Sequence, residues 1–193
     1  MRIIAGTARN RRIDAPEGKN TRPTLDRVRE NLFNILQTRI ASSVVLDLFA
    51  GSGALSLESL SRGASFAVMC DLDRNANRVE RKNTESLGFS GQTELYCCDW
   101  KTAVRKLTER GMLFDLIFLD PPYRMDDLRE VFDRLVPLLQ DDGLVIVEHE
   151  GGKPFLFGDC FEITDERKWG FCGVSFLKKI QDKSRMTEKG GEG

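Results

Sequence analysis

A chain of 193 residues has the length of one domain with a full hydrophobic core. Its hydrophobic and charged fractions, 40% and 31%, are typical of soluble globular proteins, and no apolar run approaches the roughly 18 residues that cross a bilayer. The N-terminus carries no signal-peptide core, so we expect a cytoplasmic protein without membrane contact. The net charge of −1 is unevenly spread, because residues 1–39 hold nine Lys or Arg against four Asp or Glu, a local charge of +5.

The five cysteines are an odd number and include no Cys-x-x-Cys pair, which argues against a disulfide framework and against a structural zinc site. Cys70, Cys97 and Cys98 lie in apolar strands or at their ends. We therefore expect them to be buried thiols that behave as small hydrophobic side chains. No metal is expected.

The first forty residues predict a small hairpin followed by a helix. Two short strands are expected at 2–6 and 11–15, around a turn at 8–10. After the loop 16–23, a helix begins near Thr24, a good N-cap, and presents one apolar stripe. The positive balance makes residues 1–40 a candidate arm for phosphate contacts, although charge alone fits a solvated surface equally well. The candidate contacts are Arg9, Arg11, Arg12, Lys19 and Arg27.

From residue 44 onward, strands and helices alternate. Strands are expected at 44–48, 66–70, 93–97, 114–119 and 144–148, with helices at 53–61, 74–87, 100–110 and 126–139 between them. This alternation predicts an α/β fold with a doubly wound, mostly parallel sheet. Segments 161–164 and 174–180 predict a closing antiparallel hairpin, which completes a seven-stranded sheet. The domain should span residues 41–181, and the tail 182–193 should be disordered.

The most informative motif is Asp120-Pro121-Pro122-Tyr123, directly after the apolar strand 114–119. Two prolines cannot continue a strand, because each lacks an N–H and has a fixed φ, so the chain must leave the sheet in a rigid loop. A carboxylate and a main-chain carbonyl there can accept the two hydrogens of an exocyclic amine, while an aromatic ring stacks on the base. The motif predicts a grip on a nucleobase amine.

A second motif, the Gly51-Ser52-Gly53 turn, follows the strand that ends at Asp47. The turn would bring backbone close to a ligand at the start of a helix. It lacks the lysine of a phosphate-binding loop, and Ser56 stands where a dinucleotide motif has its third glycine. Each of the first four strands ends in an aspartate, and ligands of open α/β sheets bind at that edge. These residues are Asp47, Asp71, Asp99 and Asp120.

Together with the segment Thr21–Asn34 and the opening Arg2–Gly6, these motifs resemble the bacterial 16S rRNA guanine-N2 methyltransferase family of class I S-adenosylmethionine-dependent enzymes. The resemblance extends to about residue 180. It implies S-adenosylmethionine as the cofactor and, as partner, 16S rRNA within the small ribosomal subunit or an assembly intermediate. A monomer is expected.

The resemblance also assigns roles to individual positions. Gly51 and Gly53 would face the methionine moiety, and Asp47 would hold the turn and the amino group. Asp71 would bind the ribose, with Leu72 on the adenine. The further cofactor residues are Phe49, Asp99 and Trp100, with Arg22 and Thr24 closing over the site. Asp120, Pro121, Pro122 and Tyr123 would form the catalytic loop.

One departure and two rivals stay open. Many related motifs carry Asn where Asp120 stands; both accept a hydrogen bond, but an aspartate could also take up the amine proton. A DNA adenine-N6 methyltransferase, or another nucleobase amino-methyltransferase, would use a similar loop, although this chain has little room for a separate target-recognition segment. A non-catalytic nucleotide-binding or RNA-binding module would need the glycine turn but not the base-gripping loop. His149, the only histidine, is expected to be structural.

Overall fold

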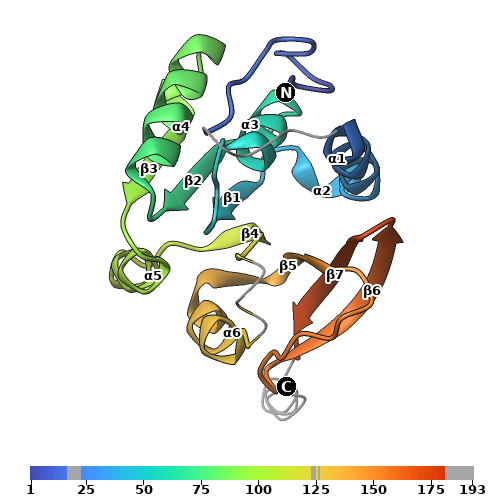
Figure 1. The fold of residues 1–193 in the computed structure, drawn as a ribbon. Coiled ribbons are helices and arrows are strands. Elements are labelled where there is room, and N and C mark those ends of the chain that lie inside the picture. Colours follow the sequence, from blue (N-terminus) through green and yellow to red (C-terminus); the bar gives the residue numbers. More distant parts are fainter. Residues whose placement is uncertain (17–22, 123–124, 126, 181–193) are drawn as a thin grey trace, which may run out of the picture.

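The computed structural model describes residues 1–16, 23–122, 125 and 127–180, with the side chains of the first helix from Asp26 onward. In this part of the chain, seven strands form one sheet in the order β3-β2-β1-β4-β5-β7-β6 (Figure 1). Strands β1 to β5 run parallel to one another. Strand β7 is antiparallel to both β5 and β6. The predicted fold class is confirmed. The strands are β1 (Val44–Asp47), β2 (Phe66–Asp71), β3 (Thr93–Cys97), β4 (Phe114–Leu119), β5 (Leu139–Glu150), β6 (Phe161–Trp169) and β7 (Cys172–Lys179).

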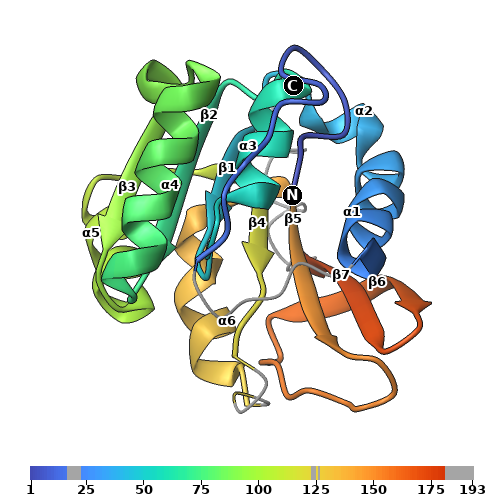
Figure 2. The ribbon, with the colours of Figure 1, turned by 45° about the horizontal axis from the view of Figure 1, so that its top comes forward.

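Helices cover both faces of the sheet (Figure 2). One hydrophobic core packs the helices α1, α2, α3 and α4 against one face of the sheet. A second core packs α5 and α6 against the other face. This two-sided cover explains why β1, β2 and β4 are almost continuous apolar runs rather than alternating ones. The helices are α1 (Pro23–Ile35), α2 (Gln37–Ile40), α3 (Ala54–Ser61), α4 (Arg74–Leu87), α5 (Trp100–Glu109) and α6 (Arg129–Leu135).

The predicted N-terminal hairpin is present but short: Arg2 and Arg12 form one antiparallel bridge, and the N–H groups of Ile3 and Ile13 donate to the carbonyls of Arg11 and Met1, at 3.0 and 3.2 Å. A longer ladder cannot form, because the N–H groups of Ile4 and Ala5 donate to the carboxylate of Glu58 on α3, at 2.8 and 3.0 Å. The segment thus lies on the body of the protein, and its apolar side chains join the same core as the sheet. These side chains are Ile3, Ala8 and Ile13.

Two other predicted elements have different bounds. The helix expected at 126–139 is α6 followed by a 3-10 turn over Val136–Leu138. Residue 139 already pairs with Phe114, and Leu144 with Leu116, so the segment around Asp142-Gly143 bulges from the ladder inside a longer β5. The end of the chain, where a disordered tail was expected, lies outside the described residues.

The cysteine prediction is only partly correct. Cys70 is fully buried in β2, but Cys97 is exposed and Cys98 half-buried, because β3 forms the edge of the sheet. The His149 ring lies 2.9 Å from Ser175 Oγ and packs against Phe155, and its structural role stays a prediction. Within the described ranges, the helices are too short or too polar to cross a bilayer.

Candidate active site

The four predicted aspartates lie along one edge of the sheet. Because β3, β2, β1 and β4 are neighbours in that order, the carboxyl ends of these strands carry the aspartates in one row. The strand order reverses between β1 and β4, since β2 follows β1 on one side and β4 lies on the other. Open α/β sheets bind ligands at such a reversal. The residues at this point are Asp47, which ends β1, and Asp120, which follows β4.

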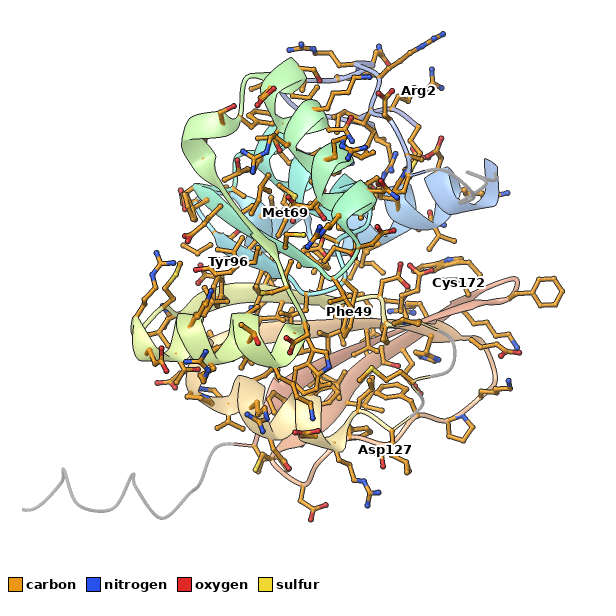
Figure 3. All side chains as sticks on the ribbon, turned by 60° about the vertical axis from the view of Figure 1, so that its left-hand side comes forward. Arg2, Phe49, Met69, Tyr96, Asp127 and Cys172 are labelled. Atoms are coloured by element: carbon orange, nitrogen blue, oxygen red, sulfur yellow. The ribbon has the colours of Figure 1, made fainter. Side chains whose placement is uncertain are left out.

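The glycine turn after β1 depends on two positive φ angles, 58° at Gly51 and 75° at Gly53. A Cβ on Gly53 would come within 2.7 Å of the Met69 sulfur, so the turn also needs glycine for space. Phe49 and Met69 are labelled in Figure 3. The turn leads directly into α3, as a ligand-cradling turn should.

Asp47 lies beneath the turn and is 1% exposed. One carboxylate oxygen, Oδ2, accepts a hydrogen bond from Ser56 Oγ at 3.2 Å. Burial raises the pKa of Asp47 to about 7, because the charged form has lost its water. The other oxygen, Oδ1, is buried without a hydrogen-bond partner among the described residues. A buried acceptor of this kind lacks a donor, which a bound ligand could supply.

Asp71 connects the end of β2 to the glycine turn. Its Oδ2 accepts from the Gly51 N–H at 2.9 Å, and its Oδ1 accepts from the Asp73 N–H at 2.8 Å. Leu72, the next residue, is 71% exposed. The pair therefore presents a carboxylate whose two oxygens already accept backbone N–H groups, and an uncovered apolar side chain. Neither residue lines the hollow at the glycine turn, so the contacts to a ribose and an adenine stay predictions.

Asp99 has a clear structural role as the N-cap of α5. Its two oxygens accept from Thr102, one from the backbone N–H at 3.0 Å and one from the hydroxyl at 2.7 Å. These bonds hold the pKa of Asp99 below its usual value. The predicted contact to the adenine amine therefore has to use the remaining lone pairs. Trp100 is half-buried beside it, with the Lys101 ammonium 5.4 Å from the ring centre.

The Asp-Pro-Pro loop shares a hollow with the glycine turn. The hollow measures about 150 Å³ and is lined by Asp120 as well as by Asp47, Phe49 and Gly51. Its other walls come from α1, from Ala15 and Pro16, and from Glu148 on β5. Burial raises the pKa of Glu148. Pro121 and Pro122 line a smaller neighbouring hollow beside Glu148 and His149. The residues predicted to meet the methionine end of the cofactor and the target amine are thus brought together.

The basic residues of the N-terminal segment divide into two kinds. The side chains of Arg9, Arg12 and Arg27 are exposed and form no hydrogen bond or ion pair with the other described residues. Arg11 instead donates to the backbone carbonyls of Ser86 and Leu87, at the C-terminal end of α4. Several predicted positions lie outside the described residues or side chains, so they stay predictions: Lys19, Arg22, Thr24 and Tyr123.

Three buried polar side chains at the site were not predicted. Asn83 on α4 donates to the carbonyl oxygens of Ser52 and Asp14, at 2.9 and 3.0 Å, and so connects the glycine turn to the N-terminal segment. Arg29 on α1 lines the hollow, is 5% exposed and forms an ion pair of 3.1 Å with Asp26. Burial lowers the pKa of Arg29.

Glu80 is the third of these side chains. It is fully buried on α4, and burial together with the nearby charges of Asp47 and Asp71 raises its pKa to about 8. Its Oε2 accepts from Asn77 Nδ2 at 3.2 Å, while Oε1 has no partner among the described residues. A sequence signal exists for both α4 residues: Glu80 and Asn83 occupy core-facing helical positions between Ala76 and Leu87.

Comparison with known proteins places the chain in a family. The family model described as "Conserved hypothetical protein 95" matches residues 1–178. The chain is 34% identical over 183 residues to YlbH of Bacillus subtilis (strain 168), which covers 93% of this chain and 99% of that protein. It is 39% identical over 152 residues to ribosomal RNA small subunit methyltransferase D of Escherichia coli (strain K12), covering 78% and 75%.

Among solved structures, the Escherichia coli protein yhhF superposes with a TM-score of 0.79 at 33% identity, and the alignment covers 94% of this chain and 99% of that one. More distant solved proteins described as S-adenosylmethionine-dependent methyltransferases share the fold alone. The candidate site therefore lies in a fold that these solved proteins share.

Proposed function

The chain belongs to the conserved hypothetical protein 95 family, and we propose that it methylates the exocyclic N2 amine of a guanine in 16S ribosomal RNA. The relatives and the fold make it an rRNA methyltransferase that uses S-adenosylmethionine. The choice of amine and base is our proposal. The amine target rests on one observation above others: Asp120 and Gly51 line the same hollow, at the reversal of the strand order. The choice of guanine N2 over adenine N6 rests on the resemblance of the sequence motifs.

The residues around the glycine turn fit S-adenosylmethionine. The unpartnered Oδ1 of Asp47 would accept from the amino group of its methionine moiety, and Gly51 leaves the backbone accessible beside it. Asp71 would hold the ribose hydroxyls, and the exposed Leu72 would cover the adenine. When bound there, the cofactor would supply an electrophilic methyl group at the reversal of the strand order.

The Asp-Pro-Pro loop then acts on the amine. An exocyclic amine is a poor nucleophile because its lone pair is delocalised into the ring. If Asp120 and the Pro121 carbonyl accept its two hydrogens, the nitrogen becomes pyramidal and its lone pair points out of the ring plane. Fixing that geometry removes orientational freedom before the reaction, which is worth a large share of the barrier. Asp120 can also take up the proton that the amine loses.

The substrate base must leave its stack to reach this hollow, so the target should be unpaired or flipped. The exposed arginines of the N-terminal segment, Arg9 and Arg12, would contact phosphates of the same RNA. The relative named small subunit methyltransferase D supports 16S rRNA within the small ribosomal subunit, or an assembly intermediate, as the partner, and hence a cytoplasmic location. Metal is not part of the proposal, and the described residues hold no cluster of three or more potential ligands.

The test is product analysis. Small ribosomal subunits that lack the modification are incubated with the protein and with S-adenosylmethionine labelled in the methyl group, and the rRNA is digested to nucleosides. We expect the label in N2-methylguanosine. Label in N6-methyladenosine would assign the protein to the adenine-N6 class and keep the loop mechanism. No label in RNA, with the cofactor bound, would indicate a binding module instead.

A further inference from the structure

The turn between β6 and β7 lies at the edge of the sheet where β1 to β5 have their carboxyl ends, which is also where the candidate active site lies. β7 runs antiparallel to β5, with Cys172 opposite Glu150, and the Gly151 N–H donates to the Phe171 carbonyl at 2.8 Å. The turn is therefore at the end of β5 that also carries Glu148, a wall of the catalytic hollow.

The turn faces α1 across a second hollow. Both ribbon views place α1 beside this end of the hairpin (Figures 1 and 2), and Figure 3 labels Cys172 next to the turn. The hollow measures about 360 Å³ and is lined by Arg27, Val28, Asn31, Trp169 and Gly170. Val28 also lines the catalytic hollow, so the two hollows adjoin through one side chain of α1.

The turn exposes an aromatic ring that the fold does not require. Gly170 forms the turn with φ of 64°, and the next residue, Phe171, is 92% exposed. A single exposed apolar residue is ordinary on a protein surface. Here the ring follows Trp169 and Gly170, which line the hollow together with Arg27. Trp169 is half-buried, and the exposed Arg27 side chain has no ion pair to the other described residues.

The hollow is lined by the Trp169 indole, the Arg27 guanidinium and the Asn31 amide, and the Phe171 ring lies exposed on the turn next in sequence to Gly170. Such groups bind an unpaired nucleotide: an exposed ring stacks on the base and the guanidinium pairs with the phosphate. We propose that the β6–β7 turn and α1 bind an unpaired nucleotide of the substrate RNA next to the methylated one, with Phe171 stacked on its base and Arg27 on its phosphate. The inference rests on the proposed function, in that the substrate is RNA, and it adds a second base-binding place to the catalytic one.

Phe171 gives a sharp test, because at 92% exposure its replacement leaves the core untouched. Phe171→Tyr keeps a stacking ring, whereas Phe171→Leu keeps an apolar side chain without one. Binding of small ribosomal subunits that lack the modification is measured by filter retention, with methylation followed in parallel. We expect Phe171→Ala and Phe171→Leu to weaken binding about ten-fold or more, as stacking predicts, and Phe171→Tyr to bind like wild type. Cofactor affinity should be equal in all four proteins.

Arg27→Ala supplies the charge arm of the test, with Arg105→Ala as its control. Arg105 is also exposed, but it lies on α5 against the other face of the sheet and pairs only with Glu109. Arg27→Ala should reduce the log–log salt slope of binding by about 0.7, and Arg105→Ala should leave it unchanged.

Equal binding by Phe171→Leu and Phe171→Tyr would overturn the inference, whether or not the protein methylates rRNA. Wild-type protein that binds the subunits but transfers no methyl group would refute the proposed function alone, and the contrast between the Phe171 variants would still decide the inference. Wild-type protein that binds no RNA would refute both.

Discussion

The Gly51 N–H donates to Asp71 Oδ2 at 2.9 Å, so the carboxylate at the end of β2 positions the glycine turn that follows β1. The bond thereby connects β1 and β2, which are neighbours in the sheet, at their carboxyl ends. The bond gives Asp71 two roles in the account: it orients the turn, and it would bind the ribose. A neutral residue at this position loses both.

Asp71→Ala should lower S-adenosylmethionine affinity by about a hundred-fold or more. It removes charge-assisted hydrogen bonds worth roughly 1.5–3 kcal/mol each and releases the turn. Calorimetry measures the affinity. Asp73→Ala is the control, because Asp73 caps α4 through the Asn75 N–H two residues away. It should cost about 1 kcal/mol of stability and leave affinity nearly unchanged. Equal affinity in wild type and Asp71→Ala would remove Asp71 from the site.

Glu80 should make the protein less stable as the pH rises. Burial raises its pKa from 4.5 to about 8, so the folded state keeps a proton that the unfolded state releases near pH 4.5. The stabilisation is complete below that pH and is lost as the pH rises toward 8. Asp47, with a pKa raised to about 7, acts in the same direction.

Glu80→Gln removes the titration of Glu80. Relative to wild type, the variant should gain stability between pH 5 and pH 8, on the order of 2 kcal/mol. Urea unfolding at several pH values measures this difference. Glu85→Gln, at an exposed position of the same helix, should give no such gain. Parallel stability curves for wild type and Glu80→Gln would show that Glu80 is ionised in the folded protein.

The basic residues of the N-terminal segment should separate into RNA contacts and structural contacts. Arg9→Ala and Arg12→Ala should each reduce the log–log salt slope of RNA binding by about 0.7–0.9, the contribution of one phosphate contact. Arg11→Ala should instead lower the free energy of unfolding by about 1 kcal/mol, because it loses hydrogen bonds to the end of α4. If Arg11→Ala changes the slope as much as Arg9→Ala does, the assignment from the structure is wrong.

Much of the sheet could be predicted because its signals are local. β3, α4 and β4 have the predicted bounds, since each is an apolar run or an amphipathic stripe between clear breaks. The short length of the N-terminal hairpin could not be predicted. It depends on Glu58, which accepts hydrogen bonds from the N–H groups of Ile4 and Ala5 although it lies 54 and 53 residues away in the sequence. The full length of β5 likewise depends on its neighbours, since Leu139 pairs with Phe114 of β4 and Glu150 with Cys172 of β7.

The site divides in the same way. The aspartates at the strand ends were visible in the sequence, because each follows an apolar run and parallel strands end at one edge. Asn83 and Glu80 were not identified, because a polar residue in a helix reveals its contacts only when the neighbouring elements are in place. That Asn83 would reach the Ser52 carbonyl depends on how α4 packs beside the glycine turn. Asp99 shows the opposite case, a predicted ligand whose oxygens cap a helix.

The central claim is that Asp120 acts on the amine inside the hollow that it shares with the glycine turn. The most direct measurement is the single-turnover rate of methyl transfer to small subunits that lack the modification, in wild type, Asp120→Ala, Asp120→Asn and Asp159→Ala. Asp159 is an exposed aspartate before β6, at the opposite edge of the sheet.

We predict that Asp120→Ala lowers the rate by roughly 10²-fold or more with cofactor affinity unchanged, as expected for a preorganised polar group that acts in the transition state. Asp120→Asn, which keeps an acceptor, should retain more activity than Asp120→Ala, and Asp159→Ala should match wild type. A single-turnover rate of Asp120→Ala within about two-fold of wild type would contradict the claim.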